Sequence, residues 1–103
     1  MKNLLTPIAL SLALSGPVAA KQDHLAENCA ALAGVAETMM MARQQGAPLA
    51  AVMQIAASDP TLREVMESMA MLAWSETRWN SPDMQRRAVS DFRDRMHLLC
   101  LGA

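Results

Sequence analysis

The side chains with the most distinctive chemistry in this 103-residue sequence carry sulfur: there are ten methionines and two cysteines. A thioether is a soft ligand for Cu(I), and a thiol can bind metal or form a disulfide. Cys29 and Cys100 are too far apart for a CxxC redox motif. In an exported chain two cysteines are typical of one disulfide, which predicts a Cys29–Cys100 bond. Free thiols or intermolecular bridges are the alternatives.

Two groups of methionines are candidate Cu(I) sites, residues 39–41 and the set Met66, Met69 and Met71. Successive residues of a helix point about 100° apart, so three consecutive thioethers cannot converge on one ion. Met66 and Met69 fall on an apolar helical stripe, where methionine commonly fills gaps in a core. The spacing therefore favours core packing, then an adaptable binding surface, and only last a Cu(I) carrier.

The sequence contains no recognisable catalytic pattern. His24 and His97 lie near no nucleophile motif, and there is no glycine-rich phosphate loop or paired-carboxylate signature. We interpret both histidines as solvated surface residues. The prediction is a protein that is not an enzyme and that uses no cofactor and no metal.

Residues 1–20 have the pattern of a signal peptide. Lys2 precedes an apolar stretch over 4–14, and small residues at 18–20 favour cleavage after Ala20. A membrane anchor is the alternative, but eleven residues at about 1.5 Å each cross only about half of a bilayer core of about 30 Å. We expect export to the periplasm or beyond, with no stable membrane anchor after cleavage.

The expected mature chain, residues 21–103, has no marked charge. It keeps ten acidic residues and all the basic ones except Lys2, which leaves eight, for a formal charge of −2. A nucleic-acid partner would favour a basic patch, which the sequence lacks. We predict no nucleic-acid partner.

The rest of the sequence predicts four helices in a single domain over 21–103. Ala, Leu, Met, Gln, Glu and Arg dominate, while tyrosine is absent and β-branched residues are few. Proline and glycine mark the boundaries. The expected fold is all-α, a small irregular four-helix bundle closed by one disulfide and preceded by a signal peptide. The expected helices run from Asp23 to Gln45 with Gly46 as stop, from Pro48 to Ala57, from Asp59 as N-cap to just before Asn80, and from Ser81 as N-cap to about Cys100.

The first of these helices is apolar on two sides, which places it at the centre of the bundle. One stripe carries Leu25, Cys29, Leu32, Ala36, Met39 and Arg43. The opposite side holds small residues around Gly34, with Met41 further along. We expect either the second helix or a second subunit to cover this face, so a homodimer through the Gly34 face is one hypothesis.

Two further stripes should complete the core. The third helix presents Leu62, Val65, Met66, Met69, Leu72 and Ala73, and the fourth presents Ala88, Val89, Phe92, Met96 and Leu99. Met71 and Trp74 fall on the other side of the third helix, and Trp79 lies near its end. They are either covered by the second helix or exposed as an anchor for a partner. The candidate interaction surface is therefore Gly34, Met41, Met71, Trp74 and Trp79.

Charged residues occur in two informative places. Arg43 and Glu76 each lie on an apolar stripe near a helix end, which predicts a structural ion pair between them. On the fourth helix, acidic and basic residues alternate every four positions, which indicates a solvent-exposed face. This ladder is Asp83, Arg87, Asp91 and Arg95.

Several segments together resemble a group of small exported helical proteins of unknown function from bacteria and their phages. The segments are NCxxLAxxAETMMMARQQG from Asn28, the Ala73–Trp74 pair, Ser81–Pro82 and AVSDFRDRMHLLC ending at Cys100. The resemblance implies export and a helical fold with one cysteine near each end of the mature chain. Those proteins tend to have tyrosine where this chain has Trp74. The resemblance implies no activity.

The function that the sequence favours is protein–protein interaction in the bacterial envelope, as an inhibitor, an immunity-like factor or a stress accessory. The partner would be an unidentified envelope or secreted protein. The alternative is a periplasmic chaperone-like holdase whose methionine-rich surface grips unfolded chains. A methionine-based Cu(I) binder is a third, less favoured reading.

Overall fold

A computed structural model describes residues 25–102, which form four helices and no strand. The N-terminal helix covers residues 25–44 and is followed by α2 (Leu49–Ala57), α3 (Arg63–Ser75) and α4 (Pro82–Leu101). The expected all-α, four-helix fold is confirmed. The expected signal peptide, the Asp23 cap and His24 lie outside the described residues. No described helix is long and apolar enough to cross a membrane.

Most of the expected helix boundaries are where proline, glycine and serine place them. Gly46 has a φ of +87°, a left-handed conformation that ends the N-terminal helix. Pro48 is the N-cap of α2. Ser81 caps α4, because its hydroxyl oxygen accepts a hydrogen bond from the backbone N–H of Met84.

The start of α3 differs from the prediction. Asp59 accepts hydrogen bonds from the backbone N–H groups of Thr61 and Leu62, as an N-cap would. The residues that it caps form only a turn, however, and α3 begins at Arg63. The aspartate therefore organises the entry to the helix without being its N-cap.

The end of α3 also differs, because the helix stops at Ser75 and residues 76–80 are not helical. Glu76 has a ψ of 154°, so the chain leaves the helix in an extended conformation. Side chains of the N-terminal helix donate hydrogen bonds to the backbone carbonyl oxygens of Glu76 and Thr77. These tertiary hydrogen bonds replace the ones that a longer helix would have made.

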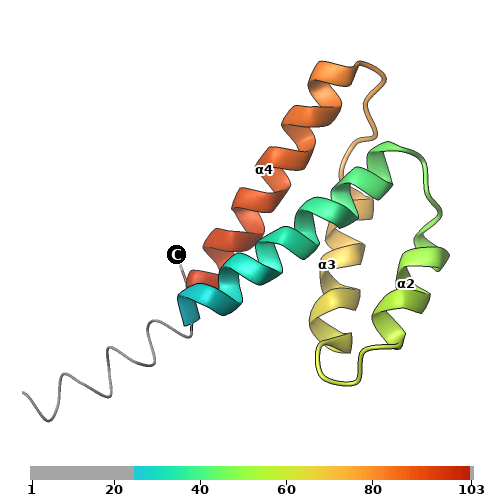
Figure 1. Ribbon diagram of the computed structural model, residues 1–103. Helices are drawn as coiled ribbons and strands as arrows, with labels where there is room; N and C mark the ends of the chain where they lie inside the picture. The colour runs from blue at the N-terminus through green and yellow to red at the C-terminus, as the bar shows by residue number, and fades with distance from the viewer. Residues whose placement is uncertain (1–24, 103) are drawn as a thin grey trace, which may run out of the picture.

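All four helices contribute to one core, and the N-terminal helix is at its centre. Figure 1 shows that this helix crosses α3 and runs beside α4, while α2 and α3 lie side by side. Met40 is fully buried and Phe92 almost so. The buried cluster is Ala36, Met39, Met40, Val52, Met69, Ala70, Ala73, Phe92 and Met96.

Two of the expected stripes are only partly buried. On α3 the buried residues are Met69, Ala70 and Ala73, with Trp74 packed against them. The larger apolar residues of the predicted stripes are exposed, namely Leu62 just before α3, Val65 and Leu72 on α3, and Leu99 on α4. The face of α3 that points into the core thus consists mainly of one methionine and two alanines.

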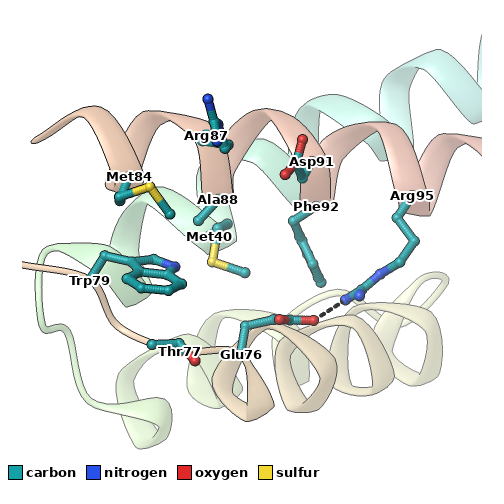
Figure 2. Close-up of a pocket in the computed structure, with 10 residues that line it drawn as sticks. All are labelled: Met40, Glu76, Thr77, Trp79, Met84, Arg87, Ala88, Asp91, Phe92 and Arg95. Atoms are coloured by element: carbon teal, nitrogen blue, oxygen red, sulfur yellow. Dashed lines mark hydrogen bonds and ion pairs between the residues drawn. The ribbon is translucent and has the colours of Figure 1, made fainter. Parts of the chain in front are cut away.

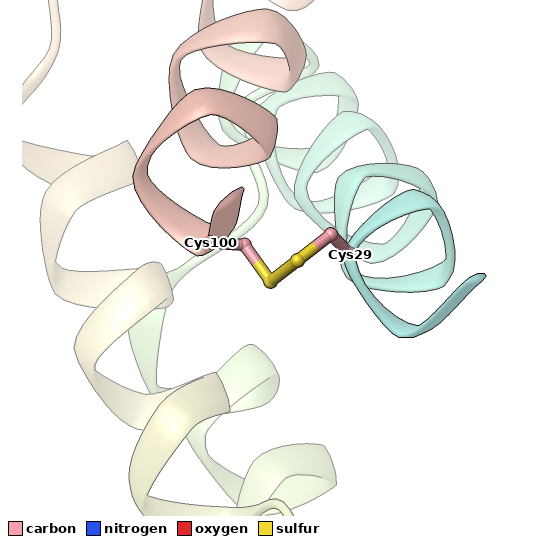
Figure 3. Close-up of a disulfide and its surroundings, with 2 residues drawn as sticks. All are labelled: Cys29 and Cys100. Carbon is pink, nitrogen blue, oxygen red and sulfur yellow. A yellow bond between two sulfur atoms is a disulfide. The ribbon is translucent and has the colours of Figure 1, made fainter. Parts of the chain in front are cut away.

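The disulfide joins the first helix to the end of the last one (Figure 3). The Cα atoms of Cys29 and Cys100 are 5.4 Å apart, although the residues are 71 positions apart in sequence. This Cα distance is within the ordinary range for a disulfide. Neither cysteine is free, so the predicted pairing is confirmed.

Candidate functional site

The C-terminal end of the N-terminal helix holds residues 76–79 through the side chain of Gln44. Its amide nitrogen donates to the carbonyl oxygen of Thr77 at 2.9 Å, and its amide oxygen accepts from the N–H of Trp79 at 2.8 Å. The Gln44 side chain is buried, with a residue exposure of 3%. One amide thus satisfies a donor and an acceptor of the extended segment, as a neighbouring strand would.

Two arginines add to this contact. The guanidinium group of Arg43 donates to the carbonyl oxygen of Glu76, at 3.1 Å from Nη2. In the reverse direction, Nε of Arg78 donates to the carbonyl oxygen of Gln44, one of the carbonyl groups that a helix end leaves without a partner. We call these contacts of Arg43, Gln44 and Arg78 with segment 76–79 the Gln44 clasp.

The clasp also lies against position 46, where the backbone conformation favours glycine. A Cβ atom there would lie 2.7 Å from Nη2 of Arg78, in addition to the strain of a positive φ. A side chain at position 46 would therefore have to displace the end of the Arg78 guanidinium group.

The predicted ion pair between Arg43 and Glu76 is wrong in its chemistry. The two residues do meet, but Arg43 binds the backbone carbonyl of Glu76. The Glu76 carboxylate instead pairs with Arg95 of α4, at 2.5 Å. A carbonyl that ends a helix offers Arg43 an acceptor without the need to bury a second charge.

A cavity of about 250 Å³ lies between α4 and segment 76–79 (Figure 2). Met40 and Phe92 form its apolar floor, Trp79 and Met84 lie at one end, and the Glu76–Arg95 pair lies at the other. We call it the Trp79 pocket; its remaining lining residues are Thr77, Arg87, Ala88 and Asp91.

The backbone of Trp79 is fixed on both sides. Its N–H binds Gln44, and its carbonyl oxygen accepts from the side-chain amide of Gln85 at 2.8 Å. The residue is nevertheless 40% exposed. The clasp therefore positions an indole ring at the surface, with an apolar floor beside it.

The mouth of the pocket carries charges of both signs. Arg95 is paired with Glu76, and its guanidinium carbon lies 5.4 Å from the centroid of the Phe92 ring. Arg87 and Asp91 are exposed, and neither forms an ion pair or a side-chain hydrogen bond with any residue in 25–102. The expected charge ladder is thus exposed, but Asp83 pairs with Arg86 rather than with Arg87.

A second, wider groove of about 430 Å³ separates the N-terminal helix from the first half of α4. Met41 and Val89 line it, and Glu37 reaches from its edge to Arg93, at 3.7 Å. The hydrogen bond from Arg93 to Asp94 and the charge of that carboxylate raise the pKa of Arg93 above its ordinary value.

The five residues of the expected interaction surface do not form one patch. Trp79 lines the pocket, and Met41 lines the groove. Gly34 is exposed, with no described atom within 4 Å of a Cβ built on it, so α2 does not cover this face. Met71 is 61% exposed. The expectation for Trp74 as an exposed anchor is wrong, since it is partly buried and packs against the core.

The methionine triplet divides between core and surface. Met39 and Met40 are buried, whereas Met41 is exposed. On α3, Met69 is likewise buried and Met71 exposed. Each group is thus split between the core and the surface, which argues against a shared Cu(I) site in either group. Among the described residues, no three His, Cys, Asp or Glu side chains are placed to hold a metal ion.

The sequence interpretation missed Gln44, the residue that organises the site. The sequence marks it only as a glutamine two residues before Gly46, within the Arg43–Gly46 segment that also contributes to the resemblance. Comparison with protein-family models, with curated proteins and with solved structures finds no match to this chain.

Proposed function

We propose that this is an exported, non-enzymatic protein that acts by binding another protein in the bacterial envelope. The observation that carries the proposal is the amount of apolar surface left outside the core. Eleven large hydrophobic residues are exposed in residues 25–102, and they come from all four helices or their ends. They are Leu25, Met41, Ile55, Leu62, Val65, Met71, Leu72, Trp79, Leu98, Leu99 and Leu101.

A partner that covered neighbouring members of this set would gain free energy from each apolar side chain that it buried. The fixed backbone around Trp79 adds a second argument. A group that is already ordered loses little conformational entropy on binding, which favours a specific partner. An inhibitor, an immunity-like factor and a stress accessory would all use such a surface.

A holdase is the second candidate, and the exposed thioethers of Met41 and Met71 favour it. Methionine is unbranched and flexible, so an exposed methionine adapts to many apolar sequences. A second copy of the chain is a further candidate partner, through the bare face at Gly34.

The decisive experiment is a saturation pull-down from envelope extract with the oxidised chain of residues 21–103. A dedicated partner would be captured to a fixed stoichiometry and would stay bound when unfolded protein is added in excess. A holdase would instead bind many clients, lose them to that excess, and suppress aggregation of a denatured test protein. Failure to capture any protein in a saturable way would overturn the proposal.

A further inference from the structure

We propose that Met41 and Met71 are modification sites at which a peroxide forms methionine sulfoxide while the fold stays intact. The oxidant class is a two-electron oxygen donor, of which hydrogen peroxide is the simplest. The sulfur forms a bond to one peroxide oxygen, the O–O bond breaks, and the peroxide leaves as water. The sulfur is thereby oxidised by two electrons. The reaction needs no protein partner, so the two sites are independent of the proposed function.

Methionines that are close in sequence differ sharply in exposure. On the N-terminal helix, Met39 and Met40 are 5% and 0% exposed, whereas Met41, the next residue, is 44% exposed. On α3, Met69 is 5% exposed and Met71 is 61% exposed. Successive helical residues point about 100° apart, so each group presents one methionine to water and keeps its neighbours in the core. A dissolved oxidant therefore reaches Met41 and Met71 first.

The sulfur of Met40 is protected by a hydrogen bond as well as by burial. Met40 has no exposed surface, and its sulfur accepts a hydrogen bond from Nε2 of Gln44 at 3.4 Å. That bond engages a lone pair of the sulfur, and lone pairs are what an oxidant attacks. A sulfoxide oxygen would also need room and a donor inside a close-packed core. Oxidation of Met40 would therefore require the core to open.

The surroundings of Met41 and Met71 can accommodate a polar product. Met41 lines the groove between the N-terminal helix and α4, and the exposed Gln45 lines the same groove one helical turn further on. The amide nitrogen of Gln45 is a donor from which a sulfoxide oxygen can accept. Met71 is the more exposed of the two, so water can solvate its sulfoxide directly. Oxidation at these positions therefore adds oxygen atoms to the surface and none to the core.

The modification would change the apolar surface without changing the core. Met41 and Met71 both belong to the exposed apolar set of residues 25–102. Methionine sulfoxide is polar, so the oxidised chain offers less apolar surface, and sulfoxide reductases reverse the step. The two sites thus provide a reversible response to an oxidant.

The test treats the disulfide-bonded chain with hydrogen peroxide, quenches the reaction at intervals, and locates each added oxygen by tandem mass spectrometry. We expect Met41 and Met71 to react at least about ten-fold faster than the four buried methionines. Those four are Met39, Met40, Met69 and Met96. Equal rates at Met40 and Met41, or at Met69 and Met71, would overturn the proposal.

Unfolding supplies the matched control. In concentrated urea every methionine is in water, so the rates at Met40 and Met41 should become similar, as should those at Met69 and Met71. If the buried methionines stay slow in urea, the local sequence rather than the fold sets the rates. That result would also overturn the proposal.

A variant without the two sulfurs tests whether these are the reactive sites. Met41→Leu with Met71→Leu keeps the apolar volume and removes both thioethers. This double variant should take up two fewer oxygen atoms in the rapid phase, while its slow phase should be unchanged. Rapid uptake equal to that of the wild type would place the reactive sulfurs elsewhere and overturn the proposal.

The product must also stay folded. Once two oxygen atoms have been added, the circular dichroism spectrum and the urea midpoint should match those of the untreated chain. Loss of the helical spectrum at that stage would overturn the proposal, because it would mean that oxidation reaches the core.

Discussion

The two ends of the N-terminal helix are tied to the rest of the chain by different means. At the first end, a disulfide joins Cys29 to Cys100, and the leucines of the chain ends around it remain exposed. At the other end, Gln44 makes a set of hydrogen bonds directly above the buried Met40. Hydrogen bonds contribute most where water is excluded, whereas a disulfide needs no core around it. The chain therefore has a covalent bond at the end where the neighbouring leucines stay exposed, although Cys29 itself is fully buried, and an amide at the end that lies over the core.

Removal of the disulfide should have the largest effect. On the chain-entropy model, a loop closed across about 70 residues stabilises a fold by about 4 kcal/mol. We expect Cys29→Ala with Cys100→Ala to lower the free energy of unfolding by about that amount, measured by urea denaturation. A reductant should destabilise the wild type and leave the double variant unchanged. A loss below about 1 kcal/mol would mean that the leucine-rich end is held by packing after all.

Loss of the Gln44 clasp should have the second-largest effect on the free energy of unfolding. Gln44→Ala leaves the Thr77 carbonyl and the Trp79 N–H without partners, which should cost about 2–3 kcal/mol. Gln44→Glu should also destabilise, because a carboxylate can accept from Trp79 but cannot donate to Thr77. Gln45→Ala is the control, since Gln45 is exposed and should change stability by less than about 0.5 kcal/mol. Equal effects at the two positions would show that the clasp adds nothing to the core beneath it.

Gly46→Ala should cost about 1–2 kcal/mol, because the left-handed conformation is strained for any residue with a Cβ atom. Contact with Arg78 should add to that cost. The same substitution made in an Arg78→Ala background separates the two contributions by a double-mutant cycle in thermal unfolding. A neutral result at position 46 would contradict the conformation that ends the helix.

Gly34→Ala should have the smallest effect on stability, and it should raise the free energy of unfolding where the other variants lower it. Gly34 lies within a helix and has open space around it, so alanine should stabilise by about 0.5–1 kcal/mol. Sedimentation should show no change of mass. If the variant instead loses stability together with a loss of mass, a second copy covers this face, and the homodimer hypothesis is supported.

The sequence was sufficient to predict where the helices lie, because their apolar periodicity and their proline and glycine boundaries agree. The sequence was not sufficient to predict which face of α3 points into the core, since that helix has apolar residues on both sides. Leu72 and Ala70 are equally consistent with periodicity, and it is the tertiary packing that buries Ala70 and leaves Leu72 exposed. Export and the interaction function stay predictions.

The site was harder to predict than the fold for a specific reason. Arg43 was matched with the right residue, Glu76, but its partner there is a backbone carbonyl, a group that every residue has and that no sequence letter marks. Segment 76–80 had no local sign of its extended form either. Its conformation depends on Gln44, more than thirty positions away.

The Cys29–Cys100 bond makes nearly the whole described domain a covalent ring, in which the start of the first helix lies beside the end of α4 (Figure 1). A protease that cuts the exposed turn between α2 and α3 would therefore release no fragment, and the two pieces would stay joined through sulfur. Exposed turns are the usual sites of such cuts. In a protease-rich compartment, one nick would thus leave the domain in one piece.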